Sequence, residues 1–292
     1  MTVSATHIRF CHQIWQLDAS VQWIQPCEGG LDIVTDISPF HPVSHIWPDH
    51  PADKGVICTE AQSVAVVDCL VGAFEHQSQQ LWIGENIPVK RDTPGWEFVV
   101  VHRVLDNCIV KFGDIVKLSV DENYQRALSR GHSAGHLAYL ALNKVLDIAY
   151  WRKDAERKDT LGHRDFNSYA QQTSTVTTDQ CVDCYRLGKT LRKRGLNSAE
   201  VIEQLSSIEN SVNQQLKDWL ALDSKVTMRC EGPSLTDSRY WQCDLHEPQL
   251  AVIPCGGTHI ESLADIAECQ VRLVKVDEQN LEMHTHVIAP SQ

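Results

Sequence analysis

The stretch Arg130-Gly131-His132-Ser133-Ala134-Gly135-His136 opens an apolar run that continues to about residue 148. Its apolar residues recur every three or four positions, which predicts an amphipathic helix. Side chains four residues apart lie on the same face of a helix, so the imidazoles of His132 and His136 should point the same way. The glutamate of the zinc-peptidase pattern is absent, because Ser133 occupies its place. We therefore expect one half of a metal site here, but no zinc-peptidase.

The other half of the expected site lies far downstream, in Pro254-Cys255-Gly256-Gly257-Thr258-His259. Two glycines relax the backbone between Cys255 and His259, so that a thiolate and an imidazole can converge on one point. A thiolate with three imidazoles is a plausible tetrahedral zinc set. We predict one zinc ion per chain, bound by His132, His136, Cys255 and His259. The alternative is a buried structural cysteine beside a histidine that is already hydrogen-bonded.

The composition is that of an ordinary globular protein. The chain has 292 residues, 42% of them hydrophobic and 22% charged, with a net charge of −12. This length is enough for two domains and a sizeable core. No apolar run approaches the length of a membrane span, and the N-terminus lacks the pattern of a signal peptide. Eleven cysteines, an odd number without an export signal, favour reduced thiols and a cytoplasmic protein.

Two regions are expected from the spacing of apolar residues. Before about residue 123, short strand-like runs such as 64–67 and 97–102 alternate with glycine and proline, which predicts an antiparallel β-barrel-like domain over residues 1–123. After it we expect a loop-rich stretch from 154 to 180, a helix near 182–193, and a helix that begins at 197–200 with a capping box. Strands then return between 225 and 287. The fold class predicted is α+β, with residues 124–292 forming a zinc-binding domain of helices packed on an antiparallel sheet.

The metal motifs, taken together, resemble the editing domain of alanyl-tRNA synthetases and its free-standing AlaX-type relatives. The likeness extends upstream: Ser38-Pro39-Phe40-His41-Pro42 is similar to the family's Thr-x-Phe-Tyr-Pro, and His50-Pro51-Ala52-Asp53-Lys54-Gly55 to its Gln-Pro-x-Asp-x-Gly. Residues 116–121 and 125–130 resemble the strand and the arginine-bearing segment before the first metal motif. Such proteins hydrolyse mischarged tRNA, and we find no aminoacylation or ATP-binding segment.

The resemblance implies a zinc-dependent trans-editing hydrolase, an aminoacyl-tRNA deacylase that acts on mischarged tRNA(Ala), above all Ser-tRNA(Ala). Its expected partner is mischarged tRNA, not DNA or a membrane. His132 and His136 would serve catalysis through the metal. Ser38, at the position of the family's threonine, and Thr258 are the candidates for recognising the hydroxyl of serine. A site built for that hydroxyl rejects the analogue that lacks it, because buried polar groups would otherwise go unpaired.

The chain departs from the family where Val43–Asp49 replaces a Gly-Gly-Gly-Gln stretch. This change puts the amino-acid specificity and the tRNA contact in question. His41, His45 and His50 in this region could form a metal or proton-transfer site. We favour a surface loop rich in histidine and proline, because prolines between the histidines give them no common face.

A bound zinc would lower the pKa of a water to about 7 or polarise the substrate carbonyl. Four protein ligands close the position that a catalytic zinc usually keeps open. One ligand could be distant, the metal could become five-coordinate, or another group could activate the water. We favour the first two of these arrangements. The sequence singles out no general base.

Nucleic-acid binding needs local positive charge, whatever the net charge. The expected tRNA contact is a basic run whose members are Arg186, Lys189, Arg192, Lys193 and Arg194. A second basic run spans 152–158. Both could instead be solvated helix faces. Cys181 and Cys184 have the spacing of half a zinc site or a redox pair, and we interpret them as unlinked thiols because no second such pair accompanies them.

Two other functions fit the sequence. One is a zinc hydrolase that acts on a small acyl ester or amide, which the acidic net charge of −12 favours. The other is a non-catalytic tRNA-binding protein with a structural zinc, its activity lost with the glycine-rich loop.

Overall fold

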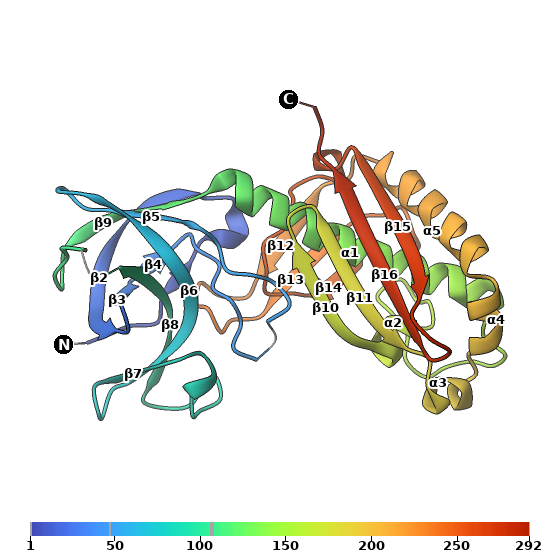
Figure 1. The fold of residues 1–292 in the computed structure, drawn as a ribbon, viewed down its shortest axis with the longest axis horizontal. Helices are drawn as coiled ribbons and strands as arrows, with labels where there is room; N and C mark the ends of the chain where they lie inside the picture. Colours follow the sequence, from blue (N-terminus) through green and yellow to red (C-terminus); the bar gives the residue numbers. More distant parts are fainter. Residues whose placement is uncertain (1, 47, 106–107, 292) are drawn as a thin grey trace. The chain divides into compact units, whose positions relative to one another are not determined.

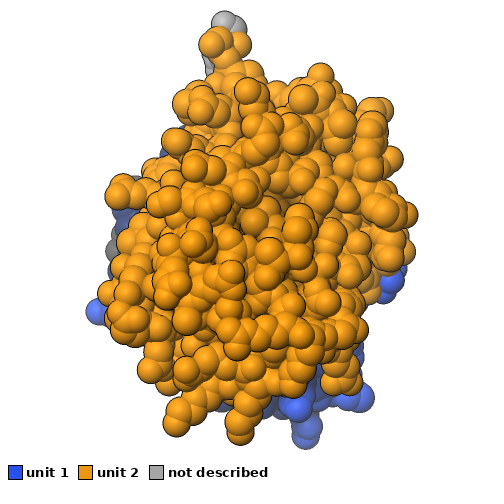
Figure 2. All heavy atoms as spheres, turned by 90° about the vertical axis from the view of Figure 1, so that its right-hand side faces the viewer, with its two compact units in different colours: residues 1–125, 230–239, 256–258 blue, residues 126–229, 240–255, 259–292 orange. Residues whose placement is uncertain are grey.

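The computed structural model describes residues 2–46, 48–105 and 108–291 of the chain. These residues form two compact units, coloured separately in Figure 2. Unit 1 comprises residues 1–125, 230–239 and 256–258, and unit 2 comprises residues 126–229, 240–255 and 259–292. The division into domains at residue 123 stays a prediction. Within the described ranges, we find no helix that is both long enough and apolar enough to span a membrane.

Unit 1 is built on a seven-stranded sheet in the order β5-β9-β2-β3-β8-β6-β7, in which all neighbours are antiparallel. A further pairing of β5 with β6 closes the sheet into a ring (Figure 1). Along β9 buried and exposed residues alternate, as expected of a strand with one face on a core. The predicted β-barrel-like fold of this region is confirmed. The strands are β2 (Gln16–Cys27), β3 (Gly30–Thr35), β5 (Gly55–Cys58), β6 (Ser63–Glu75), β7 (Gln80–Ile83), β8 (Trp96–Leu105) and β9 (Ile115–Val120).

Shorter elements complete unit 1. A parallel pair joins β1 (His7–Ile8) to β4 (Ile37–Ser38), and two 3-10 helices are η1 (Phe10–His12) and η2 (Gly84–Asn86). In this pair Ile8 lies opposite Ser38, two residues before Phe40, which is fully buried in the core.

Unit 2 packs helices on two antiparallel sheets, which confirms the α+β class. One sheet has the order β10-β11-β16-β15 and the other β12-β13-β14, and α5 packs against β15 (Figure 1). The long helix α1 (Glu122–Ala149) carries the buried leucines of its core face, including Leu137 and Leu140. The remaining elements are α2 (Phe166–Ala170), β10 (Gln171–Thr177), β11 (Gln180–Arg186), α3 (Lys189–Arg194), α4 (Ser198–Glu203), α5 (Leu205–Leu220), β12 (Val226–Cys230), β13 (Arg239–Cys243), β14 (Ala251–Pro254), η3 (Leu263–Asp265), β15 (Glu268–Lys275) and β16 (Asn280–Ile288).

Two glycines of α1 allow the helix to lie directly against the β10–β11 hairpin. A Cβ atom at Gly131 would lie 2.6 Å from the carbonyl oxygen of Gln180, and one at Gly135 would lie 2.8 Å from the Sγ of Cys181. Larger residues would therefore push the helix away from the strand. This close packing fixes the part of α1 that carries His132 and His136.

Three expectations for the chain between residues 154 and 204 are corrected or refined. Residues 182–186 belong to strand β11, so the helix predicted from 182 is wrong there and only α3 remains of it. The stretch predicted to be loop contains α2, all of β10 and the first residue of β11, and the residues of β10 are mostly exposed and polar. The helix expected from 197–200 is confirmed as α4, with Asn197 at its N-cap, although that side chain bonds to Glu200 and not to the helix backbone.

Candidate metal centre

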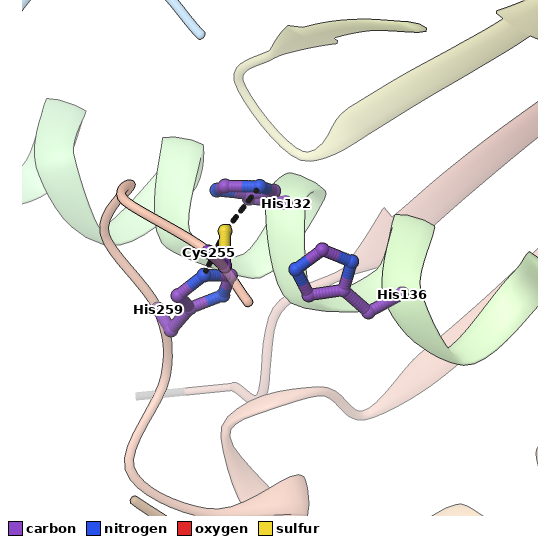
Figure 3. A group of neighbouring side chains, drawn as sticks. All are labelled: His132, His136, Cys255 and His259. Carbon is purple, nitrogen blue, oxygen red and sulfur yellow. Dashed lines mark hydrogen bonds between the residues drawn. The ribbon is translucent and has the colours of Figure 1, made fainter. Parts of the chain in front are cut away.

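The four predicted metal ligands come together within unit 2. His132 and His136 project from α1, Cys255 follows directly after β14, and His259 lies in the loop before η3 (Figure 3). Each offers one ligand atom, and these atoms lie within 4.8 Å of one another. The Sγ of Cys255 is 3.3 Å from Nε2 of His132 and 3.2 Å from Nε2 of His259. This group could hold a metal ion.

The donor set and its spacing fit zinc. Zinc–nitrogen bonds of about 2.0 Å and zinc–sulfur bonds of about 2.3 Å place neighbouring tetrahedral ligands about 3.5 Å apart. The two sulfur–nitrogen distances above are close to this separation. In addition, the Nε2 atom of His136 is buried and has no hydrogen-bond partner within the described ranges. A metal ion is one group that would take its lone pair.

Ser133, between the two helical ligands, supports the third imidazole. Its Oγ lies 3.0 Å from Nδ1 of His259 and accepts a hydrogen bond from the backbone N–H of Ile260 at 3.3 Å. A histidine that ligates through Nε2 keeps its proton on Nδ1, where a second group usually fixes the ring. Sequence reasoning treated Ser133 only as the replacement of a glutamate and missed this role.

The protonation state of His136 suits metal binding. Packing around the imidazole lowers the pKa of His136 to about 4, so that the ring is neutral near pH 7. The ring lies edge-on to Trp241 and Tyr139, with centroids 5.6 and 5.9 Å away. Neutral imidazoles are the form that binds metals.

Ser38, the first candidate for recognising serine, is fully buried within unit 1 and hydrogen-bonded to His102. Nδ1 of His102 lies 3.2 Å from the carbonyl oxygen of Ile33, which can only accept, so this nitrogen carries the proton. Nε2 therefore accepts from the Ser38 hydroxyl, 2.8 Å away. Burial lowers the pKa of His102 to about 4, which keeps the ring neutral. Ser38 Oγ also accepts from the N–H of Phe40 at 3.1 Å, which leaves one lone pair.

Thr258, the second candidate, is buried in unit 1 and paired with His50. Nδ1 of His50 donates to the carbonyl of Pro51 at 2.8 Å, so its Nε2 accepts from the Thr258 hydroxyl at 3.2 Å. Burial lowers the pKa of His50 to about 4. The hydroxyl proton of Thr258 is thus directed at His50, and its oxygen keeps two lone pairs for other partners.

The expectation of a surface loop is wrong for His41 and His50, which are 7% and 2% exposed. Their ring centroids lie 4.3 Å apart. Burial, and next the neighbouring His50, lower the pKa of His41. His45 is half-exposed, and Trp47 of the same loop lies outside the described residues. Prolines did not separate the two buried rings, because the chain turns back between them.

Asp53 fixes the backbone of this histidine segment. Its Oδ2 accepts from the N–H of His41 at 2.7 Å and from Nε2 of Gln125 at 2.6 Å. Its Oδ1 is buried and has no hydrogen-bond partner among the residues that the structure describes. Burial raises the pKa of Asp53 to about 7, because the charged form is poorly solvated there.

The predicted basic run lies at the end of β11 and on α3. Arg186, Lys189, Arg192 and Lys193 are exposed, whereas Arg194 is half-buried. The guanidinium of Arg194 lies 4.3 Å from the centroid of the Tyr169 ring. Lys189 is the first residue of α3, whereas Arg192, Lys193 and Arg194 form its last turn, which is capped by Gly195 with a φ of 112°. Four of the five charges are therefore available to a partner.

Cys181 and Cys184 do not face each other. They lie on β11, three residues apart, so their side chains point to opposite faces of the sheet. The Sγ of Cys181 contacts Asp183 at 3.8 Å, and that of Cys184 contacts Glu282 at 3.9 Å. This confirms that they are unlinked thiols, although on a strand and not at a helix start.

Comparison with known proteins finds similarity to one kind of enzyme, the alanine–tRNA ligases. No protein-family model matches the chain. An alanine–tRNA ligase of Methanobrevibacter smithii is 24% identical over 198 residues, which cover 63% of this chain and 19% of the ligase. That of Idiomarina loihiensis is 22% identical over 254 residues, 84% of this chain and 23% of the ligase. That of Wolbachia pipientis is 28% identical over 169 residues, 56% of this chain and 16% of the ligase.

The region shared with this chain covers only 16% to 23% of the length of these ligases. The ligases are therefore several times longer than the shared region. Within this chain, a group of four side chains could hold a metal ion. The chain is therefore distantly similar to alanine–tRNA ligases over most of its length, as its motifs predicted.

Proposed function

We propose that this chain is a zinc-dependent aminoacyl-tRNA deacylase that removes serine from mischarged tRNA(Ala). The observation that carries the proposal is the convergence of His132, His136, Cys255 and His259 in a relative of alanine–tRNA ligases. We assign zinc binding to an editing domain of residues 124–292, and the protein to the cytoplasm, where charged tRNA is used. When bound, zinc would supply an electrophile for the ester carbonyl or acidify a water.

Residues of the chain itself orient the candidate metal ligands. Ser133 holds the His259 ring so that Nε2 faces the thiolate of Cys255. The neutral state of His136 leaves a nitrogen lone pair for the metal without a proton to displace. These two features prepare the site before the substrate arrives, which is the condition for efficient electrostatic catalysis.

Selectivity for serine would come from hydroxyl oxygens of the protein whose protons are donated elsewhere, so that the oxygens can accept a hydrogen bond from the substrate. Because Thr258 donates its proton to His50, its oxygen can accept a hydrogen bond from the hydroxyl of a seryl group. Ser38 is arranged in the same way, with its proton on His102, but one of its lone pairs is used by Phe40. Alanine has no hydroxyl to donate, so such an acceptor would lose its partner. We therefore expect Thr258 to contribute more than Ser38.

Binding of tRNA would rest on the exposed cations Arg186, Lys189, Arg192 and Lys193. A net charge of −12 repels a polyanion, so a local cluster is needed to bind the phosphates. The same net charge favours the second candidate, a zinc hydrolase of small acyl esters. A third candidate, a non-catalytic tRNA-binding protein, would bind zinc and tRNA without turnover.

The decisive experiment measures loss of serine from Ser-tRNA(Ala) and of alanine from Ala-tRNA(Ala), with zinc-loaded and chelator-treated protein. Zinc-dependent loss of serine with alanine spared supports the proposal. Hydrolysis of a small seryl ester at an equal rate, with no gain from tRNA, would favour the small-ester hydrolase. No turnover at full zinc occupancy would favour the non-catalytic protein.

A further inference from the structure

Two half-buried thiols of unit 1, those of Cys11 and Cys230, are hydrogen-bonded to each other. Cys11 lies in η1 near the N-terminus, and Cys230 is the last residue of β12. Neither belongs to the motifs of the editing family or to the metal centre. A contact between two thiols from distant parts of a chain brings together the atoms that a disulfide would join.

Main-chain hydrogen bonds hold the two segments together. The N–H of Ile8 donates to the carbonyl of Pro233 at 2.8 Å, and an isolated bridge pairs His7 with Ser234. The segment 230–239 therefore runs beside the N-terminal residues. The contact between the thiols depends on this backbone pairing and not only on the rotamers of two side chains.

The surroundings of the pair favour different protonation states for the two sulfur atoms. The hydrogen bond from Cys11, with help from the Arg239 guanidinium, lowers the pKa of Cys230 to about 7, although burial opposes this. The same hydrogen bond, and next burial, raise the pKa of Cys11 far above its usual value. Near neutral pH a large part of Cys230 is thus thiolate, while Cys11 keeps its proton.

Arg239 is held in position by its own contacts. Its Nη1 donates to the carbonyl of Leu235 at 3.1 Å and to that of Asp237 at 3.3 Å. The guanidinium also lies 5.5 Å from the centroid of the Phe10 ring. A fixed cation beside a half-buried thiolate is the environment in which cysteines react most readily.

We propose that Cys11 and Cys230 form a reversible disulfide when the protein meets hydrogen peroxide. Cys230 is the nucleophile and Cys11 the resolving thiol. In the first step the Cys230 thiolate attacks one oxygen of the peroxide. A sulfur–oxygen bond forms, the oxygen–oxygen bond breaks, and hydroxide leaves and takes up a proton to become water.

In the second step the sulfur of Cys11 attacks the sulfenic acid of Cys230. The disulfide forms, the sulfur–oxygen bond breaks, and hydroxide leaves with the proton of Cys11 as a second water. In sum, two thiols lose two electrons and two protons, and one peroxide is reduced to two waters. A small dithiol reverses the reaction by exchange. The oxidised chain would hold segment 230–239, with Arg239, covalently to the N-terminal segment.

The test treats the full-length, zinc-loaded protein with increasing hydrogen peroxide, blocks the remaining thiols with an alkylating agent and maps the peptides without reduction. We expect a peptide pair linked through Cys11 and Cys230 before other thiols are lost, reversed by dithiothreitol. Cys11→Ser should accumulate a sulfenic acid on Cys230 that dimedone traps. Cys230→Ser should form neither product.

A matched control is Cys27→Ser, which removes another half-buried thiol whose pKa burial raises. It should form the linked pair at the wild-type rate. Released zinc is measured in the same samples, because oxidation of Cys255 would expel the metal. The linked pair should form before zinc is released.

The proposal is overturned if Cys11 and Cys230 remain fully alkylated while Cys255 or Cys27 is oxidised. It is equally overturned if dimedone labels Cys11 and spares Cys230. Should Cys11→Ser fail to fold by circular dichroism, the alkylation rate of Cys230 in the wild-type protein replaces it. Half-maximal reactivity near pH 7 supports the assignment of the nucleophile, and reactivity that rises only near pH 9 refutes it. None of these measurements depends on deacylase activity.

Discussion

Ser133→Ala is the substitution that best separates the metal centre from a chance cluster of histidines. It deletes the 3.0 Å contact with Nδ1 of His259 and the acceptor of the Ile260 N–H at 3.3 Å. Loss of a group that orients a metal ligand weakens metal affinity by about 10–100-fold. This corresponds to about 1.4–2.7 kcal/mol. The Ile260 N–H also loses a partner, which costs about 1–3 kcal/mol of stability.

Zinc affinity can be measured by competition with a chromophoric chelator, and stability by urea unfolding of the metal-free protein. The matched control is Ser129→Ala, one turn earlier on α1, where the side chain is also buried, at 5% exposed. Because Ser133 touches no substrate in this scheme, saturating zinc should restore most of the deacylation. A zinc affinity of Ser133→Ala equal to that of Ser129→Ala would refute the role of Ser133 in orienting His259.

Four further predictions follow from the described contacts. His136→Ala should lose both zinc and hydrolysis, measured by metal analysis and deacylation, and undiminished hydrolysis would contradict the metal role. Thr258→Val should bind zinc normally. Its preference for Ser-tRNA(Ala) over Ala-tRNA(Ala) should fall by about 10–100-fold, because one hydrogen-bond acceptor is gone. An unchanged preference would exclude Thr258 as the acceptor of the serine hydroxyl. Arg192→Gln and Lys193→Gln should each weaken tRNA binding. Each should also reduce the steepness of log affinity plotted against log salt concentration by about 1. Unchanged slopes would mean that α3 does not contact the phosphates of tRNA. The pKa of His102 falls from 6.5 to about 4 on folding. Above pH 6.5 the ring is neutral in both states, whereas between pH 6.5 and 4 only the unfolded state takes up a proton, so the free energy of unfolding should fall by about 3 kcal/mol across that window. His102→Gln should flatten this fall, and an unchanged profile would count against a buried neutral imidazole.

The group of four side chains that could hold a metal ion could be predicted because its geometry is encoded locally. Two histidines four residues apart share a helix face wherever that helix packs, and two glycines let Cys255 and His259 approach each other. The closed sheet of unit 1 was likewise visible in short alternating runs such as β9. The sequence could not show which groups would meet across long separations. The pairs Ser38–His102 and His50–Thr258 depend on tertiary packing and have no pattern of their own.

Strand β11 was mistaken for a helix for an identifiable reason. Its inward positions are Cys181, Asp183 and Tyr185, and a buried aspartate disrupts the apolar alternation that marks a half-buried strand. Asp183 is 2% exposed and accepts a hydrogen bond from Nε2 of Gln171 at 2.8 Å. The polar group is satisfied by the neighbouring strand, which no local pattern reveals. Full pairing of β11 with β16 then overrides the helical propensity of the segment.

The two histidines that differ from the alanyl-tRNA editing motifs are best understood as one change. His41 stands where the family pattern has tyrosine and His50 where it has glutamine, and their rings are 4.3 Å apart. Two buried imidazoles this close cannot both be charged, and burial lowers the pKa of each. A neutral His50 whose Nδ1 is bound to Pro51 can only accept at Nε2, whereas a glutamine amide both donates and accepts. The replacement therefore fixes the direction of the hydrogen bond from Thr258 and leaves its oxygen as an acceptor. Under the proposed function, we therefore interpret the exchange of these two residues, which flank the altered loop Val43–Asp49, as a change in how the serine hydroxyl is recognised and not as the loss of a site.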